Sequence, residues 1–381
     1  MQLLSIRSFI LILFAIMLAP ASACGQVFKR SAAKIRSLKN ISYTDIVQMK
    51  FSFQDNFSVD TLQSALTIVP TELSTGGYYA VKSRQNRYLY DGDRSVTLNL
   101  SDSTYKVASQ SVTGQNTRTL LYWAGQMERF SRLPPNRVVL LPDTVINAVS
   151  YSHLRVTVND TLINKEHCYT FLHFVIDKSS LLPHEISSQL RGVSEDGSVL
   201  GCIEIHSYSN YFLNKKDFPD LSFARIPDNF KLPEKPKPVI PLAAGTSAPS
   251  LDGLDLSGAR LSLDAYKGKA VLLNFGTIGC PHCVAAAQML SNLHDQFNDK
   301  GLVIINVYPH DSRDAIARFD NRFHVKSRSI TTDKRVQDSY PHSGYPSFYL
   351  LDGNGRVTVS YNGYYKELQA EITRQLKTMI Q

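Results

Sequence analysis

The sequence predicts two domains of different fold class: a mainly antiparallel β domain with a few helices, followed by an α/β domain. Three observations lead to this expectation. Strand patterns separated by turn residues follow one another over residues 76–208, a proline-rich stretch interrupts the chain at 231–244, and a short apolar strand runs into a helix pattern after residue 270. A chain of 381 residues that is 43% hydrophobic has enough apolar material for two cores.

Residues 1–23 are expected to be a signal peptide and not part of either domain. Arg7 is followed by an apolar run over 9–18 and by small residues at 21–23 that fit a cleavage site. The apolar run is too short for a membrane-spanning helix, which needs about 20 residues. Cleavage would leave Cys24 first and open to lipid attachment, although Ala21 stands where lipoproteins usually carry Leu. We therefore expect an exported protein, either soluble in the periplasm or anchored in the cell envelope through Cys24.

Residues 27–230 are expected to form the antiparallel β domain. A short helix pattern over 31–38 comes first, and short strands with turn residues between them favour an antiparallel meander. Along 95–100, for example, apolar residues at even positions alternate with polar residues at odd positions. We interpret the many aromatic residues as core and cross-strand pairs and not as a ligand cage. The expected strands are 76–81, 87–90, 95–100, 103–108, 154–158, 168–177, 184–191 and 199–208.

This strand pattern, rich in tyrosine, loosely resembles the open half-barrel sheets of LolA-like lipoprotein carriers, which have a helix on the concave side. The resemblance implies a lipid or lipoprotein cargo for residues 27–230. A docking or spacer domain without a ligand is the alternative.

Cys168 and Cys202 are candidates for a disulfide in an exported protein. In a simple meander they would lie two strands apart, at about 9–10 Å. A disulfide requires Cα atoms within about 7 Å of each other. We therefore predict that the two cysteines are not bridged.

The proline-rich stretch 231–244 is expected to link the domains. Its prolines, at nearly every other position from 233 to 241, favour a semi-rigid extended spacer. The second domain then spans 245–381. Its expected elements are strands 272–275 and 302–307, each followed by a helix (284–297 and 314–323), a hairpin of 346–351 with 357–361, and a last helix over 365–379.

The second domain is centred on Cys280-Pro281-His282-Cys283. The apolar run 270–275, bounded by Gly268 and Gly276, is typical of a buried strand, and the helix pattern follows the motif directly. Cys280 therefore lies at a helix N-terminus. Free backbone N–H groups and the helix dipole stabilise a thiolate there.

Two other interpretations of the motif were weighed. A zinc site would need a second pair of ligands at similar spacing, which the chain lacks, although His282 and His310 could complete a Cys/His set for copper or zinc. The spacing of Cys280 and Cys283 could also be accidental. A redox-active dithiol, which needs no metal or other cofactor, is the interpretation that we favour.

Four further segments fit a known pattern: Gly-Thr-Ser-Ala-Pro at 245–249, Tyr-Lys-Gly-Lys at 266–269, Tyr-Pro-Ser-Phe-Tyr-Leu at 345–350 and the turn Asp-Gly-Asn-Gly at 352–355. Together with the dithiol motif, they make residues 245–381 similar to the TlpA/ResA-type thiol–disulfide oxidoreductases, which are extracytoplasmic. The resemblance implies a thioredoxin fold. It also implies that Pro346 is cis and faces the dithiol, that it keeps metals away, and that it places the backbone of Tyr345 against the substrate.

The positions of the cysteines suggest their roles. Cys280, at the helix start, is expected to be the nucleophile, and Cys283, one turn into the helix, the buried resolving thiol. His282 is expected to tune the pair, since a donor or positive charge beside Cys280 favours the thiolate.

Several positions depart from the resembled pattern. Gly276 and Gly279 stand where relatives usually carry Trp, Asn274 where thioredoxin has a buried acid, and Tyr345 where Thr is common. The Pro-His dipeptide is like that of the oxidant DsbA. These departures leave the direction of electron flow open.

A peroxidase is not favoured. Thr277 and Cys280 fit the Thr-x-x-Cys of peroxiredoxins, but those proteins have Pro where this chain has Leu273.

The net charge of +8 comes from scattered Lys and Arg, without a basic run interleaved with aromatics, so nucleic-acid binding is not expected. The sequence thus predicts an exported thiol–disulfide oxidoreductase that reduces or exchanges disulfides. Its expected partners are cysteine-containing envelope proteins and a membrane redox partner. The alternative is an envelope carrier of lipid or protein in which the dithiol is secondary.

Overall fold

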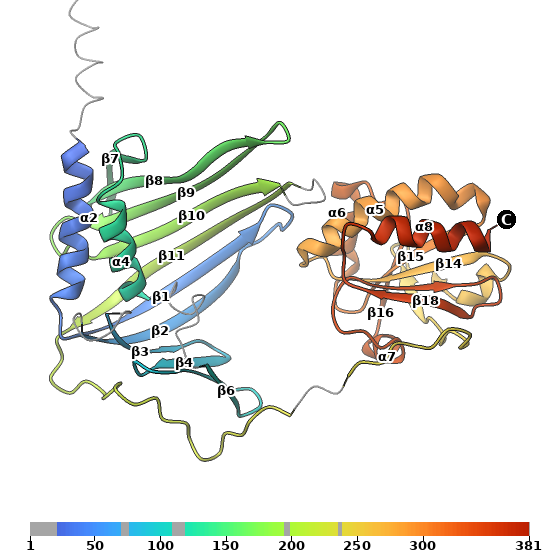
Figure 1. Ribbon diagram of the computed structural model, residues 1–381, viewed down its shortest axis with the longest axis horizontal. Coiled ribbons are helices and arrows are strands. Elements are labelled where there is room, and N and C mark those ends of the chain that lie inside the picture. The colour runs from blue at the N-terminus through green and yellow to red at the C-terminus, as the bar shows by residue number, and fades with distance from the viewer. Residues whose placement is uncertain (1–20, 70–75, 109–118, 194–198, 235–237, 381) are drawn as a thin grey trace, which may run out of the picture. The chain divides into compact units, whose positions relative to one another are not determined.

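The computed structural model describes residues 21–69, 76–108, 119–193, 199–234 and 238–380 (Figure 1). The chain divides into two compact units, and the main division follows residue 235, within the stretch expected to be a linker. No helix in the described part of the chain is long and apolar enough to cross a membrane. Of the expected signal peptide, residues 1–20 lie outside the described residues, and residues 21–23 form the start of a helix.

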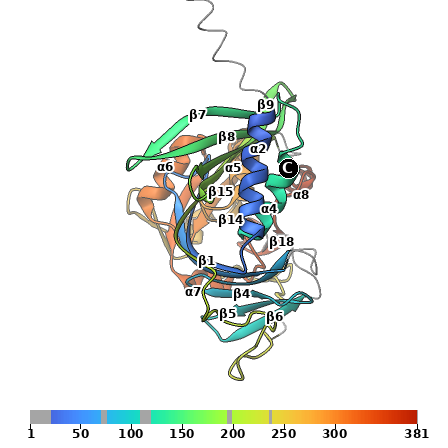
Figure 2. The same ribbon diagram turned by 90° about the vertical axis from the view of Figure 1, so that its left-hand side faces the viewer.

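The N-terminal unit is built on one sheet, which in the described residues has eleven strands in the order β6-β5-β4-β3-β2-β1-β11-β10-β9-β8-β7. Figure 2 shows that the sheet curves and that the two helices of its described residues lie on its concave side. The expected mainly antiparallel β domain is confirmed. The strands are β1 (Asn40–Phe51), β2 (Ser58–Ile68), β3 (Gly77–Lys82), β4 (Asn86–Tyr90), β5 (Ser95–Asn99), β6 (Thr104–Ala108), β7 (Val138–Ile146), β8 (Val149–Ile163), β9 (Glu166–Asp177), β10 (Pro183–Val193) and β11 (Val199–Leu213).

The helices α2 (Ala21–Arg36) and α4 (Leu120–Phe130) fill part of the concave side. A stripe on α2 spaced at three to four residues is buried, as an amphipathic helix requires: Cys24, Phe28, Ala32 and Ile35. Phe28 stacks edge-on against Phe174 of β9 at 5.0 Å between ring centroids. The aromatic residues here are therefore core pairs, as predicted.

Helix α2 begins ten residues before the helix pattern expected from the sequence at residue 31. One consequence concerns Cys24, the residue open to lipid attachment. Its side chain is 5% exposed and belongs to the core of the N-terminal unit. The structure thus places this sulfur inside the unit and not at its surface.

Strands β1 and β2 were not expected from the sequence, because polar residues break the alternation on their buried face. Asp45 of β1 is fully buried there, and its carboxylate lies 2.9 Å from Nδ1 of His206 on β11. Glu204 lies 3.4 Å from Nε2 of the same imidazole. Burial lowers the pKa of His206, but the hydrogen bonds to the two carboxylates outweigh it and raise the pKa to about 9. A buried ion cluster therefore joins two adjacent strands.

Cys168 lies on β9 and Cys202 on β11, and β10 runs between them. Both are free thiols. This arrangement is the two-strand separation on which the prediction of no bridge was based.

The C-terminal unit has a seven-stranded sheet in the order β13-β12-β16-β15-β14-β17-β18, counted over described residues. Strands β14, β15 and β16 are parallel, β17 pairs antiparallel with β14, and β18 pairs antiparallel with β17. Helices α5 and α8 pack on one face of the sheet. The expected thioredoxin fold is confirmed. The elements are β12 (Gly253–Asp255), β13 (Arg260–Leu261), β14 (Ala270–Phe275), α5 (Pro281–Phe297), β15 (Leu302–Tyr308), α6 (Arg313–Phe323), β16 (Arg328–Thr332), α7 (Lys334–Ser339), β17 (Ser347–Leu351), β18 (Val357–Asn362) and α8 (Leu368–Met379).

Candidate active site

The dithiol motif lies where the most buried strand of the C-terminal unit meets a helix. All six residues of β14 are buried, because the strand runs between β15 and β17 and is covered on both faces. Cys280 is the N-cap residue of α5, and Pro281 is its first residue. Proline suits that position because its missing N–H would have had no partner within the helix. The N–H groups that do remain there face Cys280.

Cys280 is half-buried and has the lower pKa of the pair. A hydrogen bond from the Cys283 thiol is the main cause that lowers the pKa of Cys280 to about 6. Burial opposes it, and the backbone N–H groups of Cys283 and His282 add to it. As a thiol, Cys280 can donate to the carbonyl oxygen of Tyr345, 3.6 Å from its sulfur. Cys280 therefore has the properties of an attacking thiolate.

Cys283 is 4% exposed. Its hydrogen bond to Cys280 is the main cause that raises the pKa of Cys283, and burial and the negative charge of Asp311 act in the same direction. Both cysteines are free, so the structure corresponds to the reduced dithiol. An accessible thiolate beside a buried thiol is the pairing that disulfide exchange requires.

His282, the residue predicted to tune the pair, is exposed on the first turn of α5. Its positive charge lowers the pKa of Cys280 less than the Cys283 thiol and the two backbone N–H groups do. Geometry at the helix N-terminus thus contributes more than the histidine. The tuning role of His282 stays a prediction.

Pro346 and Tyr345 lie beside the dithiol because of strand register. Strand β17 pairs antiparallel with β14, and Ser347 lies opposite Phe275. The residues just before β17 are therefore at the end of β14 from which the dithiol segment leaves. The peptide bond between Tyr345 and Pro346 is cis, and Pro346 is buried.

Asp311 is a residue of this site that sequence reasoning missed. It follows β15, which pairs in parallel with β14, so the segments that leave both strands lie at one edge of the sheet. Its Oδ2 accepts a hydrogen bond from the Ile278 N–H at 3.3 Å, and its Oδ1 accepts one from the Thr277 hydroxyl at 3.4 Å. The available signal was a carboxylate soon after a buried parallel strand, since site residues gather at the carboxyl ends of such strands.

Asn274 stands at the position where thioredoxin has a buried acid. It belongs to a row of neutral side chains that are hydrogen-bonded to one another under the site. Its Nδ2 donates to Oδ1 of Asn306 at 3.0 Å, and Nδ2 of Asn306 donates to the hydroxyls of Ser327 and Ser329 at 2.8 and 3.3 Å. Asn274 and Asn306 are register partners on β14 and β15, so the row crosses the sheet from strand to strand. These four side chains carry no charge near neutral pH, and at the far end Ser329 hydrogen-bonds the carboxyl of Asp320, whose pKa burial raises to about 6.

The metal alternative gains no support from the geometry. In the described residues, no group of three or more His, Cys, Asp or Glu side chains is arranged to hold a metal ion. The ring of His310 contacts that of Tyr345 at 6.4 Å between centroids.

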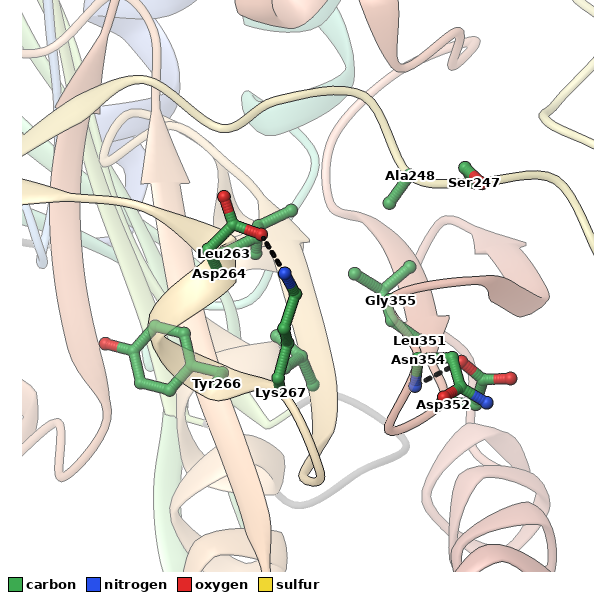
Figure 3. Close-up of a pocket in the computed structure, with 11 residues that line it drawn as sticks. Ser247, Ala248, Leu263, Asp264, Tyr266, Lys267, Leu351, Asp352, Asn354 and Gly355 are labelled. Carbon is green, nitrogen blue, oxygen red and sulfur yellow. Dashed lines mark hydrogen bonds and ion pairs between the residues drawn. The ribbon is translucent and has the colours of Figure 1, made fainter.

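The C-terminal unit also has a pocket, whose lining residues are drawn in Figure 3. It lies between residues 247–248, the short 3-10 helix Leu263–Tyr266 and the turn 352–355, and an ion pair of 3.0 Å joins Lys267 and Asp264 at its rim. Val271, the residue of β14 that lines it, is four positions along this strand from Phe275, which is about 13 Å. The pocket is therefore not part of the dithiol site.

Comparison with known proteins bears on the C-terminal unit. Residues 244–375 match the AhpC/TSA family. The thiol-disulfide oxidoreductase ResA of Bacillus subtilis (strain 168) is 29% identical over 123 residues, which is 32% of this chain and 69% of the relative. ResA of Geobacillus kaustophilus (strain HTA426) is 29% identical over 118 residues, 30% of this chain and 67% of the relative.

Among solved structures, the thioredoxin domain of a thiol-disulfide oxidoreductase from Bacteroides vulgatus is 25% identical, with a TM-score of 0.34. The match covers 37% of this chain and 99% of that one. The relatives bear out the resemblance found in the sequence, and the expected class of enzyme, a thiol–disulfide oxidoreductase, is confirmed.

Proposed function

We propose that this protein, whose residues 244–375 form a thioredoxin-fold domain of the AhpC/TSA family with ResA relatives, is exported and reduces or exchanges disulfides in cysteine-containing proteins of the cell envelope. The observation that carries the proposal is the dithiol itself. Cys280 has a pKa of about 6 and is half-buried at the start of α5, beside the buried thiol of Cys283. No metal or cofactor is needed for this chemistry, because the two sulfurs carry the electrons.

The reaction follows from the difference between the two thiols. The Cys280 thiolate attacks one sulfur of the partner's disulfide, a mixed disulfide forms, and the other partner sulfur leaves as a thiolate. Cys283 then loses its proton and attacks the Cys280 sulfur. The partner sulfur that was bound to Cys280 leaves as a thiolate. The partner is thereby reduced by two electrons, and Cys280 and Cys283 are oxidised to a disulfide. A membrane redox partner would return two electrons to the dithiol. If the protein acts as an oxidant, the same steps run in reverse order.

Tyr345 and Pro346 supply backbone next to the attacking sulfur in this scheme. The carbonyl of Tyr345 lies 3.6 Å from the Cys280 sulfur, so a partner chain bound there would run past the dithiol. The role of His282 is a minor addition to the charge at the helix start.

Export is part of the proposal and rests on the sequence of residues 1–23. Lipid attachment to Cys24 would require its sulfur to leave the core of the N-terminal unit, where it is 5% exposed. We therefore favour a soluble periplasmic protein over a lipid-anchored one. Intact mass of protein isolated from cells tests this: cleavage after Ala23 with an unmodified Cys24 is expected, and an added diacylglyceryl mass would contradict it.

The carrier function weighed from the sequence is not favoured. Aromatic side chains of the concave face, such as Phe174, are used in packing against α2 and α4.

Partner trapping tests the proposed function. In Cys283→Ser, the mixed disulfide on Cys280 cannot be resolved, so envelope proteins should accumulate as adducts on non-reducing gels. Cys280→Ser is the matched control and should trap nothing. Equal adducts in the two variants, or none in either, would refute the function. The reduction potential then gives the direction: about −270 mV for a reductant and about −120 mV for an oxidant.

A further inference from the structure

The resolving thiol has a proton to lose and little solvent into which to lose it. Cys283 is 4% exposed. In the reduced dithiol its hydrogen bond to Cys280 raises its pKa most, and burial, which the mixed disulfide keeps, raises the pKa as well. A neutral thiol is a poor nucleophile. Attack on the mixed disulfide therefore needs a proton acceptor close to this sulfur.

The nearest polar side chain beneath the thiol cannot accept the proton. A Cβ placed on Gly276 would lie 3.6 Å from the Cys283 sulfur and 3.8 Å from Nδ2 of Asn274, so the amide and the sulfur lie on the same side of this glycine. Asn274 is neutral, and Asn306 and its serine partners are neutral as well. The carboxyl of Asp320 meets this row only at Ser329, beyond Asn274 and Asn306, so it is farther from the thiol along the row.

Asp311 is linked to the same sulfur through the segment of residues 277 and 278. It is hydrogen-bonded to Thr277 and Ile278, and the N–H of Thr277 is itself a hydrogen-bond donor to Cys283. The carboxylate and the thiol therefore bind neighbouring atoms of one short segment. The charge of Asp311 acts on Cys283 and on two tyrosines, Tyr308 and Tyr345.

The other titratable groups around this carboxylate do not fit the task. The pKa of Tyr308 and that of Tyr345 are both raised, mainly by burial, so these phenols stay protonated at neutral pH. His310, the neighbour of Asp311 in sequence, is exposed and contacts the ring of Tyr345. Cys280 is bound in the mixed disulfide at this step and carries no charge.

We propose that Asp311 is the proton acceptor for Cys283 in the resolving step, acting through one intervening water, in place of an acid at position 274. This inference rests on the proposed function. The proton of the Cys283 thiol passes to the Asp311 carboxylate, and the Cys283 sulfur bonds to the Cys280 sulfur. The bond between Cys280 and the partner breaks, and the partner's thiolate leaves with the electron pair and takes up a proton from Asp311 or from water.

Single-turnover reaction with the chromogenic disulfide dithiobisnitrobenzoate tests the proposal, because it separates the two thiols. Attack by Cys280 releases a first coloured thiolate, and resolution by Cys283 releases a second. The parent protein for all measurements carries Cys202→Ser, which removes the half-exposed thiol, whereas Cys24 and Cys168 are buried. Cys283→Ser must abolish the second release and so identifies it.

In Asp311→Asn the second release should slow about 100-fold while the first stays within about twofold of the parent, since general base catalysis contributes on this scale. The rate of the second release in Asp311→Asn should then rise about tenfold per pH unit, as expected when hydroxide replaces the carboxylate as the proton acceptor. Asp311→Glu should recover most of the rate. Asp314→Asn, which removes an exposed carboxylate from the first turn of α6, is the matched control and should match the parent.

Three outcomes overturn the proposal. The second release in Asp311→Asn could equal that of the parent, both releases could slow together with a fall in melting temperature, or Asp314→Asn could have the same effect. A parent protein that gives no second release at all would instead contradict the proposed function, and the inference with it.

Discussion

The low pKa of Cys280 depends on a hydrogen bond from Cys283, and this dependence can be tested with two variants that differ by one oxygen atom. The Cys283 thiol is the first cause of the shift to a pKa of about 6 from an ordinary value of 9.0. Cys283→Ala removes the donor, whereas Cys283→Ser replaces it with a hydroxyl that can still donate to the thiolate.

The expected size of the effect follows from the thiolate fraction. With a pKa of about 6, about nine-tenths of Cys280 is thiolate at pH 7, whereas with a pKa of 9.0 the fraction is about one-hundredth. The backbone N–H groups at the start of α5 remain in both variants. In Cys283→Ala the pKa of Cys280 should therefore rise by only part of the difference between about 6 and 9.0. We expect its Cys280 pKa to rise by about 1 to 2 pH units and that of Cys283→Ser to rise by less than about 0.5.

The assay is the rate of Cys280 alkylation by iodoacetamide as a function of pH, again in the Cys202→Ser background. Each variant has one reactive thiol, so the midpoint of the rate profile is the pKa of Cys280. The reasoning is refuted if Cys283→Ala and Cys283→Ser titrate at the same pH. It is also refuted if both titrate below about 6.5, because the helix terminus alone would then account for the shift.

The remaining predictions concern other parts of the molecule. In His282→Ala the alkylation midpoint should rise by less than in Cys283→Ala, because the charge of His282 is the smallest of the causes; an equal rise would contradict this order. The pKa of His206 is raised to about 9 from about 6.5 in the unfolded chain. Its pairing with Asp45 and Glu204 therefore stabilises the N-terminal unit fully below about pH 6.5. This stabilisation is lost as the pH rises through about 9. The melting temperature should therefore fall between pH 7 and pH 10 more in the wild type than in a double variant His206→Leu with Asp45→Leu, and parallel curves would contradict the prediction. Leu290→Ala should destabilise the C-terminal unit by about 2–5 kcal/mol in urea unfolding, because Leu290 is 1% exposed in the core under α5, and a loss below about 1 kcal/mol would contradict this packing.

The centre of the C-terminal unit, from β14 into α5, could be predicted because its signals are local, whereas β12, β13, β16 and α7 were not expected. The mainly apolar run of β14, the glycines at its ends and the cysteine motif indicate a strand, a turn and a helix start within about 15 residues. The proximity of Tyr345 and Pro346 came from the family resemblance and not from their position in the sequence. Register between β14 and β17 explains it, and register across 65 residues has no local signal.

Asp311 and Asp45 show why other features were missed. Asp311 belongs to the site only because β14 and β15 are parallel neighbours, which a single sequence does not display. Asp45 stands on the buried face of β1 and breaks the apolar alternation by which strands are recognised. Its partner His206 lies 161 residues away. In both cases, a polar residue had a tertiary partner that local pattern reading cannot supply.

The beginning of α2 also bears on how the protein would mature. Residues 21–23, the expected cleavage segment, are helical here, and Cys24 directly after them is held in the core. A peptidase binds its substrate as an extended chain, so it could not cut a segment already wound and docked in this way. In the proposed exported protein, the leader would have to be removed before the first turn of α2 forms, so cleavage would precede the folding of this helix.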